Sequence, residues 1–232
     1  VALLFFATTI NYLDRQVIGL LKPTLEKELN WSETDYSFIV MCFTASYAIG
    51  LLFFGKIIDQ IGSKLGYTIS IIIWSIAAMF HALAKSSFGF GAARAVLGLG
   101  EAGNFPAAIK SVAEWFPKKE RAFATGIFNS GTNIGAIVAP LTVPFIAAQW
   151  GWRWAFILTG AVGFIWLIFW WFLYEIPSKS KRLGKAELAY IHSDAEDFLE
   201  EDILQPKAVM SWAQLLLFKQ TWAFAIGKFL TD

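Results

Sequence analysis

Long apolar runs without a single charged residue dominate the sequence. Four of them contain no Asp, Glu, Lys or Arg over twenty residues or more, at 36–55, 65–84, 122–152 and 154–174. A helix needs about 20 apolar residues to cross about 30 Å of hydrocarbon. The pattern therefore predicts four membrane-spanning helices.

Two further apolar segments, 1–25 and 87–110, have the length of a span but contain charges. With them, the pattern predicts an all-α membrane protein with a six-helix bundle in residues 1–175, joined mostly by short connections. Residues 176–210 are rich in charge and are expected to form a cytoplasmic linker with amphipathic helices. A seventh apolar segment starts within 211–232, so we expect a fragment whose C-terminal six-helix half is missing.

The composition agrees with a membrane protein and narrows its chemistry. Hydrophobic residues make up 56% of the chain and charged residues 16%, with a mean hydropathy of +0.53. A net charge of +1 gives no reason to expect a nucleic-acid partner. Cys42 is the single cysteine, so there is no disulfide framework or metal-ligand spacing, and we expect no metal and no cofactor.

Lys and Arg are distributed unequally between alternate connections, which predicts an orientation. Basic connections stay in the cytoplasm, so the side with more Lys and Arg, and the N-terminus with it, is expected to be cytoplasmic. The richer side has Lys56, Lys64, Lys118, Lys119, Arg121, Lys179, Lys181, Arg182, Lys185 and Lys207, and the poorer side has Lys22, Lys27, Lys85 and Arg153.

The first and fourth spans place ionisable groups in hydrocarbon, where each costs about 2.5–3.5 kcal/mol on an insertion scale. Asn11, Asp14 and Arg15 border one face of a helix near the membrane midplane. Arg94 and Glu101 are seven residues apart, about two turns, and share a face. If both helices line one cavity, two arginines and two carboxylates meet there. The alternative is a set of structural ion pairs that holds the bundle together.

Small residues and a proline predict how these helices pack. Gly98 lies between the two charges of the fourth span and allows close approach, as do Gly131 and Gly135 in the fifth span. Pro106 lacks a backbone donor and is expected to bend or loosen the inner part of the fourth span.

The intramembrane charges favour a transport hypothesis. An anion that enters the cavity can form bidentate contacts with Arg15 and Arg94. It brings excess negative charge, which protonation of Asp14 or Glu101 neutralises. Anion and proton then favour each other's binding, as a symporter requires.

Neutral polar side chains add further candidate ligands. Tyr47 lies deep in the second span, and Asn129, Thr132 and Asn133 lie in the fifth. Hydroxyls and amides suit a polyhydroxylated ligand. Hydrogen bonding between helices is the alternative for each of them.

The motifs along the whole chain resemble the N-terminal half of major facilitator superfamily transporters. Within that superfamily they are similar to the anion:cation symporters, which include bacterial hexuronate and galactonate permeases. The stretches that carry the resemblance are NYLDR at 11–15, RAVLGLGEAGNFPA at 94–107, EWFPKKERAFATGIFNSGTNIG at 114–135 and GWRWAFILTGAVGFIWLIFWWFLYEIP at 151–177.

The resemblance implies two inverted three-helix repeats and import of a sugar acid with protons by alternating access. It makes Asp14 and Glu101 the proton carriers and Arg15 and Arg94 the residues that handle the substrate carboxylate, with Tyr47 facing the sugar acid. It also implies a monomer in the inner membrane of a bacterium, with a small organic anion, protons and the lipid bilayer as partners.

The resemblance further implies a cytoplasmic gate. The connection GKIIDQIGSKLG at 55–66 is similar to the loop signature of the superfamily, with Asp59 and Lys64 in place. Asp59 is expected to cap or pair near a helix end and to latch the outward-facing state. Glu120 and Arg121 are candidates for the same latch, with a solvated loop as the alternative.

Three other functions are alternatives to sugar-acid transport. A transporter of inorganic phosphate or another small anion would use the arginines but not the amides and hydroxyls. A non-transporting membrane sensor could keep the same scaffold. A membrane-embedded enzyme would need a positioned nucleophile or metal ligands, and the sequence offers no such set.

Overall fold

The computed structural model describes residues 1–180, 183–191, 193 and 217–231, and these residues contain helices but no strands. The chain divides into two compact units, residues 1–191 and 192–232. The first unit contains α1 (Ala2–Leu29), α2 (Glu33–Ile61), α3 (Ser63–Phe80) with the 3-10 helix η1 (His81–Leu83), α4 (Ser87–Glu101), α5 (Asn104–Trp115), α6 (Lys118–Trp150), α7 (Trp152–Leu173), the 3-10 helix η2 (Pro177–Lys179) and α8 (Lys185–Ile191). The second contains α10 (Lys219–Thr231), where a seventh helix was expected. Most of the predicted linker lies outside the described residues.

The connections between the helices are shorter than predicted. Gly62 and Gly151 are the junctions before α3 and α7, and both have positive φ, 86° and 89°. Glycine adopts such angles without steric cost. The first span was expected over residues 1–25, but α1 continues through Pro23 to Leu29 and ends at Asn30 with φ 53°. Ser32 and Asp35 then form a capping box that starts α2.

Within the described residues, four helical segments have the length and apolarity to cross a membrane, and they coincide with the four uncharged runs: Glu33–Ile61, Ser63–Leu83, Lys118–Trp150 and Trp152–Leu173. The charged first span forms the long helix α1. The charged fourth span is divided into α4 and α5. Large apolar side chains such as Phe123 and Phe172 are exposed on the outside of the bundle, as contact with lipid requires.

Pro106 explains the division between α4 and α5. A proline at this position cannot donate a hydrogen bond to the carbonyl of Ala102, four residues earlier. The helix is interrupted there: α4 ends at Glu101 and α5 begins at Asn104. The predicted loosening of the fourth span is confirmed, and the break directly follows Glu101.

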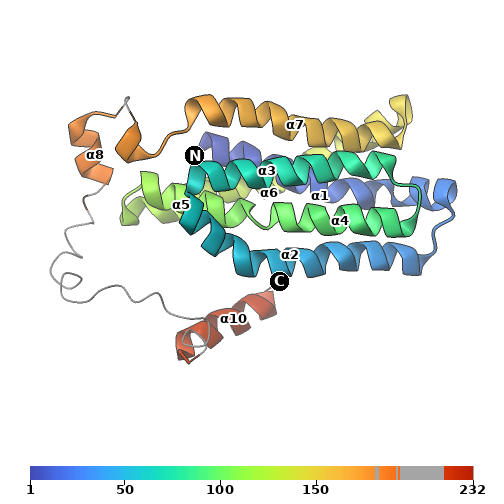
Figure 1. Ribbon diagram of the computed structural model, residues 1–232, viewed down its shortest axis with the longest axis horizontal. Coiled ribbons are helices and arrows are strands. Elements are labelled where there is room, and N and C mark those ends of the chain that lie inside the picture. Colours follow the sequence, from blue (N-terminus) through green and yellow to red (C-terminus); the bar gives the residue numbers. More distant parts are fainter. Residues whose placement is uncertain (181–182, 192, 194–216, 232) are drawn as a thin grey trace. The chain divides into compact units, whose positions relative to one another are not determined.

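The long helices form two groups of three spans, α1 to α3 and α4 to α7, in which α4 and α5 together make one span. Helices of each group pack against helices of the other. Figure 1 shows the long helices running side by side, with α5 following α4 end to end. Helix α1 packs against α6, α2 against α4, and α3 against α4 and α7. The first helix of each group therefore packs against the second helix of the other, as two repeats related by a pseudo-twofold axis should. Glycines permit both crossings, because a Cβ on Gly98 would lie 2.6 Å from the carbonyl oxygen of Phe43 in α2, and one on Gly131 2.5 Å from that of Phe5 in α1.

The polar residues of α1 lie between two buried apolar clusters. Leu4 and Ala7 belong to one cluster, and Val17 and Leu21 belong to the other. Asn11, fully buried, lies in the turn between them. The N-terminus lies at the same end of the bundle as the start of α3 and the end of α5 (Figure 1). The connections richer in Lys and Arg therefore share one end with the N-terminus.

Candidate functional site

An ion pair between Arg15 and Glu101 joins α1 to α4 in the interior of the bundle. Nε of Arg15 donates to Oε2 of Glu101 at 3.0 Å, and Nη2 lies 2.8 Å from the same oxygen. The Glu101 side chain is fully buried, whereas the Arg15 side chain retains 23% exposure. The two charged spans therefore line one site, as expected.

Arg94 is brought to the same site but has no carboxylate partner among the described residues. Its side chain is buried, with 2% exposure. Nη2 donates to the backbone carbonyl of Arg15 at 3.3 Å, and Nε has no hydrogen-bond partner among the described residues. Arg94 forms no salt bridge within the described part of the chain. It is therefore a buried cation whose guanidinium still has an N–H donor that an anion can use.

Asp14 is the corresponding buried acid. It is 2% exposed, and neither carboxylate oxygen accepts a hydrogen bond from any described residue. The groups close enough to influence it are Thr159 of α7, Glu101 and Arg94. Asn11, one turn earlier, is fully buried, and neither of its amide atoms has a hydrogen-bond partner in the described part of the chain.

Aromatic rings surround the Arg15 guanidinium. Its Cζ lies 4.9 Å from the ring centroid of Tyr12, 5.1 Å from that of Phe43 and 4.6 Å from that of Tyr47. Tyr47, predicted to face the substrate, is therefore at the site. Tyr12 and Phe43 were not predicted, although Phe43 is one turn from Tyr47 on the same face of α2.

The polar residues of α6 lie apart from this charged cluster. Asn129 and Asn133 are exposed and Thr132 is half-buried. The Thr132 hydroxyl donates to the backbone carbonyl of Asn129 at 2.8 Å. Within the described residues none of the three forms a hydrogen bond with Arg15 or Arg94, so their role as ligands stays a prediction.

The four predicted gating residues form separate contacts near the ends of the helices. Asp59 accepts from Nζ of Lys110 in α5 at 2.9 Å, and Lys64 donates to Glu175, after α7, at 3.0 Å. The ammonium of Lys64 holds the pKa of the Glu175 carboxyl below its usual value. Glu120 accepts from the hydroxyl of Tyr190, whereas Arg121 caps the end of α5 by donating to the carbonyls of Phe116 and Ala113, each at 3.0 Å.

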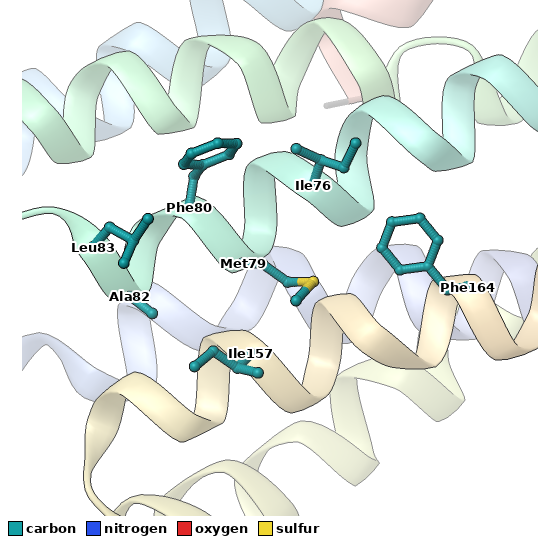
Figure 2. A pocket seen from close by; sticks show the side chains of 7 residues that line it. All are labelled: Ile76, Met79, Phe80, Ala82, Leu83, Ile157 and Phe164. Atoms are coloured by element: carbon teal, nitrogen blue, oxygen red, sulfur yellow. The ribbon is translucent and has the colours of Figure 1, made fainter.

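An apolar groove lies elsewhere, between the α3–η1 segment and α7. Figure 2 shows its lining, which includes Met79 and Leu83 from one side and Ile157 and Phe164 from the other. Its volume is about 430 Å³, and none of its lining residues is charged. It offers no group that could bind an anion.

Curated relatives match the whole chain or nearly so. The chain is 36% identical to the hexuronate transporter of Escherichia coli (strain K12), over 100% of this chain and 53% of that protein. It is 35% identical to the galacturonate transporter of Dickeya chrysanthemi, over 100% of this chain and 66% of that protein. It is 30% identical to the D-galactonate transporter of Escherichia coli O6:H1, over 98% and 54%. The chain thus spans between about half and two thirds of the length of these relatives.

Solved structures and a family model agree on the fold. The proton:xylose symporter XylE superposes with a TM-score of 0.66 at 16% identity, over 86% of this chain and 50% of that chain. A bacterial homolog of the human lysosomal transporter Spinster, in an inward-facing and unoccupied conformation, superposes with a TM-score of 0.68 at 23% identity, over 85% and 48%. The model of the Major Facilitator Superfamily matches residues 4–231. The chain is an integral membrane protein that belongs to this superfamily of transporters.

Proposed function

We propose that the protein containing this chain imports a sugar acid of the hexuronate class together with protons, by alternating access. The observation that carries the proposal is the unequal pairing of four intramembrane charges. Arg15 and Glu101 neutralise each other at 2.8 Å. Among the described residues, the buried Arg94 has no carboxylate partner and the buried Asp14 has no hydrogen-bond partner. An uncompensated buried charge costs about 3–5 kcal/mol, so each of the two is suited to a partner that arrives from outside.

The substrate carboxylate is the partner for Arg94, and a proton is the partner for Asp14. With Asp14 protonated, the Arg15–Glu101 pair is neutral and Arg94 leaves one positive charge, which one monoanion neutralises. With Asp14 ionised, the four groups are already neutral and the same anion brings an excess charge. Proton and anion therefore bind cooperatively, in the reciprocal sense that linkage demands.

The substrate class rests on the relatives and on the polar groups at the site. Three relatives are named as transporters of hexuronate, galacturonate and D-galactonate. The hydroxyl of Tyr47 and the guanidinium of Arg15 are available to a polyhydroxylated acid. Asn129 and Asn133 are exposed and Thr132 is half-buried, so we infer that they face the substrate path.

The proposal includes an orientation and a gate. The N-terminus is cytoplasmic, in a bacterial inner membrane, because the ends richer in Lys and Arg lie together with it. The Asp59–Lys110 pair and the Lys64–Glu175 pair tie helix ends together at the cytoplasmic side. We propose that the protein works as a monomer, because the arginines and acids of the site all come from one chain.

The test is uptake by the full-length protein in proteoliposomes. Labelled galacturonate is expected to accumulate under an inward proton gradient but not under a sodium gradient, and Arg94→Ala should abolish it. Arg153→Ala, in a pair with Glu28 whose side chains are about half exposed, is the matched control and should behave as the parent. If the parent takes up phosphate and no sugar acid, or if Arg94→Ala transports normally, the proposal is wrong.

A further inference from the structure

One aromatic ring contacts both arginines of the site. The centroid of the Phe43 ring lies 5.1 Å from Cζ of Arg15 and 5.4 Å from Cζ of Arg94. Both distances are within the range of about 6 Å over which a cation is attracted to a ring. Phe43 belongs to α2, so a third helix takes part in placing two guanidiniums that come from α1 and α4.

The backbone around Phe43 is held firmly against α4. Gly98, one turn after Arg94, approaches so closely that a Cβ there would lie 2.6 Å from the carbonyl oxygen of Phe43. The Ser46 hydroxyl donates to the same carbonyl at 2.9 Å. The ring itself stacks on Tyr47 with an interplanar angle of 12° and a centroid separation of 5.7 Å. The Phe43 ring therefore has little freedom to move away from Arg94.

A ring suits two neighbouring cations better than a carboxylate would. Two guanidiniums repel each other, and a third acid between them would neutralise charge and occupy N–H donors that an anion needs. The face of an aromatic ring attracts both cations through its quadrupole and accepts no conventional hydrogen bond from them. Nε of Arg94 accordingly has no hydrogen-bond partner among the residues that the structure describes.

We propose that Phe43 is a positioning residue that holds Arg15 and Arg94 together with their donors directed at the substrate anion. This inference rests on the proposed function for the identity of the anion, but the placement of the arginines does not depend on which anion is carried. Phe43 sets the affinity for the substrate and has no part in proton coupling.

The transport test compares Phe43→Leu with Phe43→Tyr in the full-length protein. Leucine keeps apolar volume and removes the quadrupole, so KM for galacturonate should rise about tenfold while the dependence on the proton gradient is unchanged. Tyrosine keeps the ring and should leave KM within about twofold of the parent. Phe53→Leu, an exposed residue of the same helix, is the control for a phenylalanine-to-leucine change. A KM for Phe43→Leu equal to that of the parent overturns the inference.

A second measurement decides the inference without a substrate. Phenylglyoxal labels accessible arginines, and mass spectrometry reports the rate at each site. Release of the guanidiniums in Phe43→Leu should raise labelling of Arg15 several-fold relative to Arg153, whereas Phe43→Tyr should label as the parent does. If the parent fails to transport any sugar acid but this pattern appears, the proposed function is wrong and the placement by Phe43 stands. Equal labelling of Arg15 in all three proteins contradicts the placement.

Discussion

At the scale of single residues, the site is defined by which buried charges have partners. The sequence predicted both arginines and both acids, because each is an exception within an apolar segment. It could not predict that Arg15 pairs with Glu101 while Arg94 and Asp14 have no such partner, since that depends on how α1 is rotated against α4. It also missed Phe43, because one phenylalanine among 22 carries no distinguishing signal.

Glu101→Gln tests the role of the paired acid. The change removes the ionic partner that Arg15 contacts at 2.8 Å and a site for a proton, but it keeps the side-chain shape. Exchange of labelled for unlabelled galacturonate should persist, whereas accumulation driven by a proton gradient should fall to the level seen without a gradient. Glu28→Gln, in a half-exposed pair, is the control and should accumulate substrate as the parent does. Full accumulation by Glu101→Gln would show that this acid is structural.

At the scale of helices, the pattern of small residues and prolines was the most informative part of the sequence. Gly131 and Gly135 were predicted to allow a tight crossing, and they pack against the backbone of α1. Pro106 was predicted to loosen the fourth span, and the helix is interrupted there, since α4 ends at Glu101 and α5 begins at Asn104. The ends of helices were less predictable: α1 continues past Pro23 to Leu29, because packing of Leu21 and Leu25 in the core offsets the cost of a proline in the helix interior.

Gly131→Val should disrupt the crossing of α1 and α6. Its first side-chain atom would lie 2.5 Å from the carbonyl oxygen of Phe5, so the helices must separate, at a cost of about 1–3 kcal/mol or more. Gly126→Ala is a matched control in the same helix, because nothing lies within 4 Å of a Cβ there. Thermal unfolding in detergent should show a clear loss of stability for Gly131→Val and none for Gly126→Ala. Equal melting temperatures for the two variants would contradict the packing described for α6.

The Lys64–Glu175 pair predicts a dependence of stability on pH. The neighbouring ammonium lowers the pKa of Glu175 below its ordinary value of 4.5. A lowered carboxyl pKa contributes stability that is present above the ordinary pKa and is lost as pH falls through the lowered one. Glu175→Gln should therefore melt at a slightly lower temperature than the parent at pH 7, and the difference should shrink as pH falls below 4.5. The effect is small, since the Glu175 side chain is 42% exposed and solvent screens the pair. A difference that grows on acidification would contradict the assignment.

At the scale of the whole molecule, this chain is one bundle of a transporter whose relatives are longer. Its fold follows from the sequence, because six apolar segments with short connections and glycine crossings leave few ways to pack. The partners of the gating residues did not follow from it: Lys110, which pairs with Asp59, lies 51 residues away in a separate helix. Asn129 and Asn133 are exposed and form no hydrogen bond with Arg15 or Arg94 among the described residues, so their place in a substrate path stays a proposal.

The most direct test of the account is whether substrate binding takes up a proton at Asp14. Galacturonate is added to the full-length protein in detergent and weak buffer. Proton uptake is measured with a pH-sensitive dye while binding of the anion is measured in the same sample. The parent should take up about one proton for each anion bound, and Asp14→Asn should bind the anion with no proton uptake. Anion binding without proton uptake in the parent, or equal proton uptake in Asp14→Asn, would contradict the coupling of Arg94 and Asp14 proposed for this site.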